Sequence, residues 1–355
     1  MGKLHGRWKI ATCVIRARQD CRPGFSAAMR PSAPGAGSAT TGFCRRIVNR
    51  FFALAVVVAT SGAAAADSPP FDPRPFLTPQ ESILGGFGSP PSPLPIRTPT
   101  GSYLKLLHPS AVAANGPDLY VADSGRRLLL RIDTVTKAIT PLREITAAPG
   151  IRLETDRDGS VYLLQPNQAS VERISRDGRR ISLFSSEFEI LQPADIAVER
   201  SQGRLWMSDR AGGVFAFHPS GRMEQSLLER NDGFPDELAG ATLLAADRLG
   251  IVGIDPRCRC LIAFGPDGAY SGHFGDGELI DPVDLAIDTH GRVWVIDRGD
   301  RLLKIFVGRQ RVGAIQAASL GLVEMTALTI DGFQAYISDA QGGKIAVFAV
   351  VPPRP

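Results

Sequence analysis

The feature that most constrains the fold is a pattern that recurs six times between residues 108 and 349. Each copy contains a short apolar strand that ends at a polar residue, which is Gln165 in the second copy and Asp in the others: Asp123, Asp209, Asp255, Asp297 and Asp339. Successive positions are 42, 44, 46, 42 and 42 residues apart. A period of this length, with several short strands per unit, predicts a β-propeller.

Each copy contains runs of four to six residues rich in Val, Ile, Leu and single aromatics, separated by turns such as "PDG" and "RDG". Such runs are typical of short buried strands, and helical periodicity is absent. The sixth copy stops after three strands, so we expect its outer strand to come from residues 81–88 or 101–107. The predicted fold is all-β: a six-bladed β-propeller of four-stranded blades, closed by an N-terminal strand.

The segments "PADIAV" with "GRLWMSD" (193–209) and "PVDLAIDTHGRVWVIDRGDRLLKIF" (282–306) resemble NHL repeats. The resemblance covers residues 108–349, and the second and fourth copies depart from the pattern. In the second copy Gln165 replaces the Asp, and the fourth copy lacks the aromatic residue. Membership of an exported bacterial NHL type implies a six-bladed propeller that serves as a binding scaffold or, less often, as an enzyme.

Residues 1–66 are predicted to be a leader that ends in an export signal. Arg45, Arg46 and Arg50 precede an apolar run at 51–60, and a small-residue stretch follows at 64–66. The apolar run is about half the length that a membrane-spanning helix needs. We therefore expect a periplasmic or secreted protein without a transmembrane anchor after cleavage, translated from Met1 or Met29.

The rest of the chain divides into three parts by composition. Residues 67–99 include ten prolines, so residues 67–100 are expected to form an extended linker or a segment packed along a surface. The propeller is predicted over 101–350, and residues 351–355 form a tail.

Removal of the leader reverses the net charge. The leader holds ten of the 40 basic residues and one of the 36 acidic residues, which leaves 30 basic and 35 acidic side chains. A net acidic domain has no overall attraction for phosphate backbones, so no nucleic-acid partner is expected.

The recurring Asp residues are predicted to be structural. Each lies where a strand turns into the next, and a short carboxylate in that position accepts backbone N–H bonds. Aromatic residues at one equivalent strand position are expected to fill the space between blades.

The position that opens each innermost strand faces one mouth of the central channel. It is filled by Arg152, Asp195, Thr242 and Asp284 in the four middle copies, and by Ser110 or Ala111 and Thr326 or Ala327 in the outer two. Asp195 and Asp284 are candidate ligands for Ca²⁺, which prefers hard oxygen donors. The alternative is that Arg152 neutralises Asp195 in an ion pair. No other cofactor is expected.

Cys258 and Cys260 are the two cysteines that remain after the leader. In an oxidising compartment their spacing favours a local disulfide, because a turn would bring their Cα atoms within the range that a bridge tolerates. Two unpaired thiols and a soft-metal site are the alternatives.

The sequence favours a monomeric, exported binding scaffold. Its loops and channel mouth would recognise an envelope protein, a peptide or a glycan. The alternative is a calcium-assisted small-molecule hydrolase of the lactonase type, with Asp195 and Asp284 as metal ligands and Arg152 orienting the substrate. His108, His218, His273 and His290 fall at different points of the repeat, which argues against a zinc lyase that needs convergent imidazoles.

Overall fold

The computed structural model describes residues 76–89, 101–166, 168–185, 190, 192–227 and 234–353. The predicted leader at 1–66 and its export signal lie outside the described residues, as does most of the proline-rich segment. Within the described part, no helix has the length and apolar character needed to cross a membrane.

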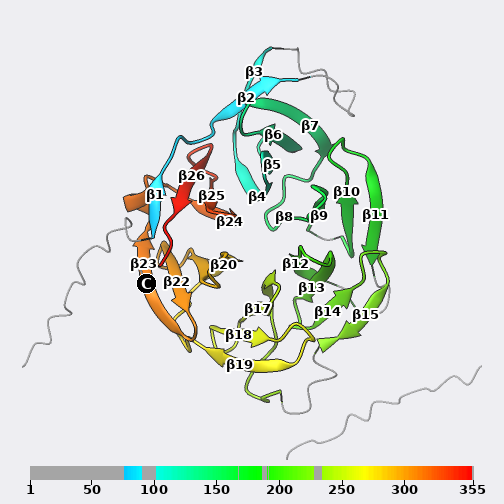
Figure 1. The fold of residues 1–355 in the computed structure, drawn as a ribbon, viewed down its shortest axis with the longest axis vertical. Coiled ribbons are helices and arrows are strands. Elements are labelled where there is room, and N and C mark those ends of the chain that lie inside the picture. The colour runs from blue at the N-terminus through cyan, green and yellow to red at the C-terminus, as the bar shows by residue number, and fades with distance from the viewer. Residues whose placement is uncertain are drawn as a thin grey trace, which may run out of the picture. The chain divides into compact units, whose positions relative to one another are not determined.

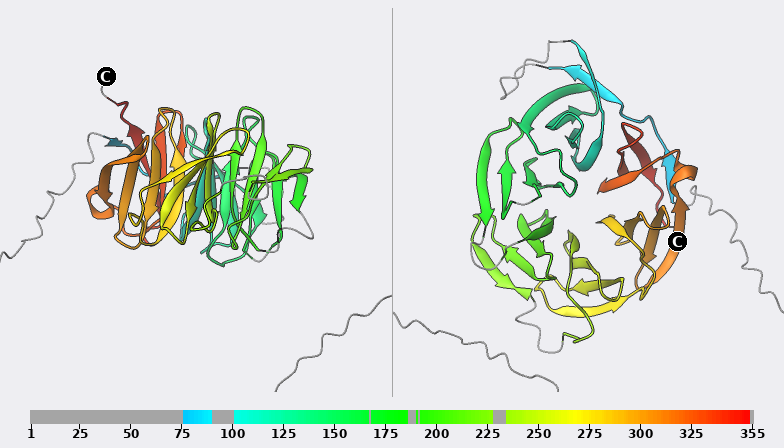
Figure 2. Two further views of the ribbon diagram at one scale, coloured as in Figure 1. Left: turned by 90° about the horizontal axis from the view of Figure 1, so that it is seen from below. Right: turned by 180° about the vertical axis from the view of Figure 1, so that it is seen from behind.

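Six sheets surround a central channel, each with four strands from the repeat or its closing segment, so the predicted six-bladed β-propeller is confirmed (Figure 1). The strands run across the thickness of the ring (Figure 2). From the axis outward, the first three blades are β4 (Pro109–Asn115), β5 (Asp118–Asp123), β6 (Leu128–Asp133) and β7 (Ala138–Glu144); β8 (Arg152–Thr155), β9 (Val161–Leu164), β10 (Ser170–Ile174) and β11 (Arg180–Ser185); and β12 (Pro193–Glu199), β13 (Arg204–Asp209), β14 (Val214–Phe217) and β15 (Met223–Ser226).

The second half of the ring repeats this order. Its blades are β16 (Leu243–Asp247), β17 (Gly250–Asp255), β18 (Cys260–Phe264) and β19 (Tyr270–Phe274); β20 (Pro282–Ile287), β21 (Val293–Asp297), β22 (Leu302–Val307) and β23 (Gln310–Gln316); and β24 (Met325–Asp331), β25 (Gln334–Asp339), β26 (Lys344–Val350) and β1 (Leu77–Pro79). A short 3₁₀ helix, η1 (Ala317–Leu320), follows β23.

An N-terminal strand closes the ring, but it is not the one that the sequence suggested. The outer strand of the sixth blade is β1, which pairs antiparallel with β26 so that Leu77 lies opposite Val350. Leu77 is fully buried in the core between the fifth and sixth blades, and Phe76 packs edge-on against Trp294. Apolar contacts of Phe76 and Leu77 therefore hold the closing strand, β1, against the fifth and sixth blades.

The strands of the two segments that were expected to close the ring extend the first blade instead, although Ile83 of the first segment forms a β-bridge with Ile345 of β26. β2 (Gly85–Gly88) pairs parallel with β7, and β3 (Tyr103–Lys105) pairs antiparallel with β2. This placement needs glycine, because a Cβ on Gly86 would lie 2.5 Å from the carbonyl oxygen of Lys137. The first sheet thus has six strands.

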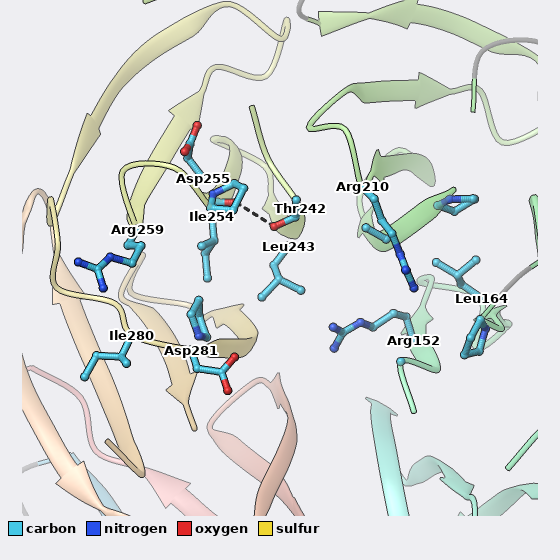
Figure 3. A pocket seen from close by; sticks show the side chains of 16 residues that line it. Arg152, Leu164, Arg210, Thr242, Leu243, Ile254, Asp255, Arg259, Ile280 and Asp281 are labelled. Carbon is cyan, nitrogen blue, oxygen red and sulfur yellow. Dashed lines mark hydrogen bonds between the residues drawn. The ribbon is translucent and has the colours of Figure 1, made fainter. Parts of the chain in front are cut away.

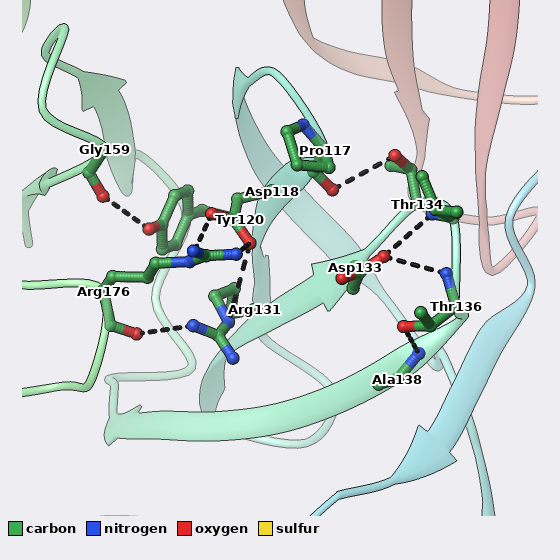
Figure 4. Close-up of polar contacts among 11 residues, drawn as sticks. Pro117, Asp118, Tyr120, Arg131, Asp133, Thr134, Thr136, Ala138, Gly159 and Arg176 are labelled. Atoms are coloured by element: carbon green, nitrogen blue, oxygen red, sulfur yellow. Dashed lines mark hydrogen bonds and ion pairs between the residues drawn. The ribbon is translucent and has the colours of Figure 1, made fainter.

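Buried aromatic residues of the second strands fill the space between blades. Trp206, Trp294, Tyr120 and Tyr162 are among the largest fully buried side chains. The hydroxyl of Tyr120 in the first blade also donates to the carbonyl of Gly159 in the second, at 2.6 Å (Figure 4). Such contacts fix the relative placement of neighbouring blades.

An ion pair holds the same two blades together. Asp118 of the first blade lies 2.6 Å from the guanidinium of Arg176 of the second blade, and Arg131 of the first blade donates to the Arg176 carbonyl (Figure 4).

The five recurring carboxylates connect each turn to the loop that enters its blade. Each accepts backbone N–H bonds from the segment before the innermost strand: Leu107 and His108 donate to Asp123, Gln192 to Asp209, Ala239 and Gly240 to Asp255, Ile280 and Asp281 to Asp297, and Val323 and Glu324 to Asp339. Each also accepts an N–H bond from its own turn. Gln165 accepts the N–H of Thr146 in the corresponding place.

Candidate functional site at the channel mouth

The innermost strands place one equivalent side chain per blade around the axis. In each blade, this residue of the innermost strand pairs with the second-strand residue immediately before the turn Asp or Gln. The six residues that meet this definition are Ala111, Arg152, Asp195, Leu243, Asp284 and Ala327. Thr242 thus lies one residue before the equivalent position, which Leu243 occupies. Thr242 still lines the mouth, and its hydroxyl lies 3.3 Å from the carbonyl oxygen of Ile254.

Arg152, Asp195 and Asp284 come together in the channel although they belong to three different blades. The Nε of Arg152 lies 3.3 Å from Asp195 Oδ1, and its Nη1 lies 3.9 Å from Asp284 Oδ1. The same Nη1 donates to the carbonyl of Val283 at 2.8 Å. One guanidinium therefore lies between two carboxylates.

Both carboxylates also bind the innermost strand of the following blade. Asp195 Oδ2 accepts the N–H of Leu244 at 2.8 Å, and Asp284 Oδ2 accepts the N–H of Leu328 at 2.6 Å. Each of these amides belongs to the innermost strand of its blade. On the side that faces the channel, that strand has no neighbouring strand of its own sheet to accept the N–H bond. The two Asp residues thus link neighbouring blades around the axis.

Burial changes the acidity of the channel carboxyl groups. It raises the pKa of Asp284 to about 7, against the opposing effect of Arg152, and the nearby charge of Asp195 raises it further. Burial also raises the pKa of Glu154 to about 8 and raises the pKa of Asp195. Because burial outweighs the opposing charges of Arg152 and, at Glu154, of Arg200, part of this group retains a proton near neutral pH.

The arrangement does not fit a calcium ion. Calcium takes six to eight oxygen ligands, whereas Arg152 fills the space between Asp195 and Asp284, and each carboxylate already binds a backbone amide. No group of three His, Cys, Asp or Glu ligand atoms converges at the channel within the described residues. Calcium binding at Asp195 and Asp284 stays a prediction, and it would require Arg152 to leave the space between them.

A cavity of about 420 Å³ opens at the end of the channel where Arg152 lies. Arg152 and Arg210 extend into it from one side and Asp281 from the other, while the Arg259 side chain lies at the rim and turns away from the centre (Figure 3). Leu164 contributes apolar surface. The cavity combines cationic groups, a carboxylate and apolar walls, which suits a small polar ligand with a negative charge.

Two further arginines of the mouth, Arg210 and Arg259, have no anionic partner among the described residues. Arg210 and Arg259 are both exposed, and neither side chain forms an ion pair within the ranges described above. Asp281 across the cavity is paired with Arg298 at 2.7 Å. The mouth therefore presents unpaired positive charge.

A second cavity of about 520 Å³ lies at the opposite end of the innermost strands. There Arg200 of the third blade pairs with Asp331 of the sixth at 2.7 Å and donates to the carbonyl of Ala114 of the first at 2.9 Å. Glu154 reaches this cavity from the second blade. Acidic side chains outnumber basic ones in this lining, with Glu154, Glu199, Asp247, Asp288 and Asp331 against Arg200 and Arg248, so this end is the weaker candidate for a site that binds an anion.

Cys258 and Cys260 form a disulfide in the turn between β17 and β18, with their Cα atoms 5.2 Å apart. Arg259 lies between them and contributes to the rim of the mouth. The disulfide is therefore adjacent to the candidate site.

Arg210, Arg259 and Glu154 were not predicted from the sequence to be site residues. Arg210 directly follows the turn Asp209, and Arg259 lies four residues after Asp255, so counting outward from the recurring Asp would have selected both turns. Their side-chain directions could not be read that way, because turns lack the strict alternation of a strand.

No known family model matches this sequence, and no curated protein matches it. Solved structures do share its fold. A protein of unknown function from Bacteroides thetaiotaomicron has 14% identity and a TM-score of 0.53 over 77% of each chain. A gluconolactonase from Xanthomonas campestris has 16% identity and a TM-score of 0.54, over 77% of this chain and 99% of the other.

A virginiamycin B lyase from Staphylococcus aureus has 14% identity and a TM-score of 0.50, over 78% of this chain and all (100%) of the other. At these identities the likeness concerns the propeller fold alone. The assignment to NHL repeats stays a prediction.

Proposed function

We propose that this chain is an exported binding scaffold that recognises an anionic group of an envelope protein, a peptide or a glycan at the arginine-lined mouth. The observation that carries the proposal is the charge of Arg210 and Arg259, which pair with no carboxylate of the residues that the structure describes, beside a cavity of about 420 Å³. Arginine binds carboxylates with two parallel hydrogen bonds, which gives both strength and orientation.

The placement of the channel carboxylates supports binding rather than catalysis. Asp195 and Asp284 hold backbone amides of the next blade and flank Arg152. Their hydrogen-bonding capacity is thus largely used within the fold. Asp281 and Thr242 remain at the cavity wall, where they would accept hydrogen bonds from ligand hydroxyl groups, so acidic sugars are a suitable ligand class.

The test is binding of the full chain to an array that pairs each acidic glycan or peptide with its neutral counterpart. We expect the bound members to share a carboxylate, and Arg210→Ala to weaken their binding at least ten-fold. Arg222→Ala is the matched control, because Arg222 is exposed on an outer turn away from the mouth. Equal binding of neutral counterparts, or wild-type binding by Arg210→Ala, would reject the proposal.

A small-molecule hydrolase of the lactonase type is the second candidate. It is favoured by the raised pKa of Asp284, about 7, because a carboxyl group with a pKa near the working pH can exchange protons with a substrate. If calcium assists such an activity, the ion should raise the melting temperature of the full chain, and Asp284→Asn should abolish the rise. The absence of a shift with any divalent ion would remove the metal-assisted form of this function.

A further inference from the structure

The turn that carries Cys258 and Cys260 does not need a disulfide to form. Equivalent turns in the first and fifth blades contain Arg127 and Arg301 where the fourth blade has Arg259, and all three have a left-handed backbone, with φ of 58°, 61° and 52°. In each blade the carbonyl of this Arg accepts an N–H bond from the outgoing loop, donated by Ile145, Ala317 and Leu279. Two blades thus make the same turn without cysteine, which leaves the cysteine pair available for another role.

The loop after β19 brings a carboxylate to the two sulfur atoms. Asp276 lies between Gly275 and Gly277, whose positive φ values of 73° and 70° allow the loop to turn back. The N–H of Gly277 donates to the carbonyl of Cys258 at 3.1 Å. This backbone bond holds the loop against the cysteine turn independently of any ligand.

The result is a cluster of three potential metal ligands. The Sγ atoms of Cys258 and Cys260 and a carboxylate oxygen of Asp276 all lie within 4.8 Å of one another. In the part of the chain that the structure describes, it is the one group of three His, Cys, Asp or Glu residues that meets this criterion. The cluster lies at the surface, because Asp276 is exposed and Cys258 is partly so.

A histidine lies behind the carboxylate. His273 Nε2 is 3.6 Å from Asp276 Oδ1, and its Nδ1 is 2.8 Å from the hydroxyl of Tyr270. A carboxylate that binds a metal is commonly held in place by groups of the surrounding shell. His273 is thus placed to position Asp276 rather than to contact the metal.

We propose that Cys258, Cys260 and Asp276 form a zinc site when the disulfide is reduced. A dithiol reductant transfers two electrons and two protons to the disulfide, which becomes two thiols while the reductant is oxidised to its own disulfide. Zinc binding then displaces both thiol protons to solvent, and the two thiolates and the carboxylate hold the ion. Water takes the fourth position.

The ligand types and their spacing select zinc. Thiolate pairs bind Zn²⁺ at about 2.3 Å and carboxylate oxygens at about 2.0–2.2 Å in a tetrahedral arrangement. Those bond lengths separate neighbouring ligand atoms by roughly 3.3–3.8 Å, so small side-chain rotations convert the observed cluster into a site. Magnesium and calcium prefer oxygen ligands alone and are not expected to bind.

The proposal is independent of the ligand at the mouth, because none of its ligand atoms belongs to the arginines there. Its test uses the full chain with Cys13, Cys21 and Cys44 replaced by Ser, so that Cys258 and Cys260 are its remaining thiols. Cobalt(II) is the spectroscopic probe and zinc the competitor. We expect the reduced protein to bind one equivalent of cobalt with thiolate charge-transfer absorption, to release it to zinc, and the oxidised protein to bind none.

Variants of the proposed ligands test whether the bound cobalt occupies this site. Cys258→Ser with Cys260→Ser should abolish binding, and the fold should persist because two other blades make this turn without cysteine. Asp276→Asn should weaken binding at least ten-fold, whereas Asp267→Asn, in an exposed turn of the same blade, should leave it unchanged. The proposal is overturned if the reduced protein binds no more cobalt than the double serine variant, or if Asp276→Asn binds as tightly as the parent.

Discussion

At the scale of single residues, the channel is governed by an imbalance of charge. One guanidinium, that of Arg152, lies between Asp195 and Asp284, and Glu154 lies further along the channel. All three carboxyl groups have a raised pKa because burial disfavours their charged forms more than the nearby guanidinium favours them, which is Arg152 for Asp195 and Asp284 and Arg200 for Glu154. The folded protein therefore holds protons here that the unfolded chain releases.

This imbalance predicts a fall in stability with rising pH. The pKa of Asp284 is about 7 in the fold and 3.8 in the unfolded chain, so between these values folding takes up a proton. The contribution of Asp284 to the free energy of unfolding should then decrease as pH rises through this window, by up to about 1.4 kcal/mol per pH unit, and level off above pH 7, while Glu154, with a pKa of about 8, continues the fall to that pH. Asp284→Asn removes this titration and, by removing its charge, also lowers the pKa of Glu154.

Urea unfolding of both proteins from pH 5 to pH 8 measures the difference. The Asp284→Asn variant should lose less stability than the wild type over this range. Asp267→Asn, at an exposed turn, serves as the control and should follow the wild type. Parallel curves for wild type and Asp284→Asn would show that Asp284 is ionised throughout.

At the scale of elements, the feature that recurs in five blades is a turn carboxylate that accepts hydrogen bonds from the loop leading into its blade. Asp297 is the example that also pairs with a buried lysine. It accepts the N–H groups of Ile280, Asp281 and Gly299, and it pairs at 2.7 Å with Lys304, whose side chain is 1% exposed. Its loss would leave three amides without this acceptor and would remove one of the three partners of the Lys304 ammonium, which also contacts Asp300 and the Glu278 carbonyl.

Asp297→Ala should therefore lower the free energy of unfolding by about 3 kcal/mol, which is the usual cost of breaking a buried, charge-assisted network. Asp267→Ala is the matched control, because that carboxylate is exposed and accepts one local amide, from Ala269. Its effect should stay within about 0.5 kcal/mol. Urea titration measures both, and equal effects would mean that the turn carboxylates do not hold the fold.

The fold was predictable from the sequence because the same pattern of strands and turns occurs six times. Six similar segments fix the period, and strand alternation then fixes which residues face the channel. Counting along the strands brought Arg152, Asp195 and Asp284 to one place, as the structure shows. A cluster that depends on strand register in this way is accessible without coordinates.

Features that depend on irregular backbone were not predictable. The innermost strands of the first, third, fifth and sixth blades have a bulge near their start, as between Pro193 and Asp195, whereas β16 pairs without one. In the fourth blade, counting along the sequence selected Thr242, whereas the strand pairing places Leu243 at the channel position. The approach of Asp276 to Cys258 likewise depends on a loop that folds back, which no strand pattern encodes.

At the scale of the whole molecule, closure of the ring depends on a short segment from before the first blade. β1 supplies three residues, yet it completes the sixth sheet and covers the core beside the fifth blade. Backbone bonds continue past its ends, since Gln80 donates to Val347 and Val351 to Phe76. The stability of the ring should therefore be sensitive to this segment.

Leu77→Ala tests that dependence. Leu77 is 0% exposed, and its removal leaves a cavity where the first and last parts of the propeller meet, so we expect a loss of about 3 kcal/mol in the free energy of unfolding. Leu84→Ala is the control, because Leu84 is 48% exposed in the same N-terminal region and removes little buried surface. Its cost should stay below about 1 kcal/mol. If the two variants unfold at the same urea concentration, β1 does not close the ring in solution, because a docked Leu77 cannot be truncated without the cost of its cavity.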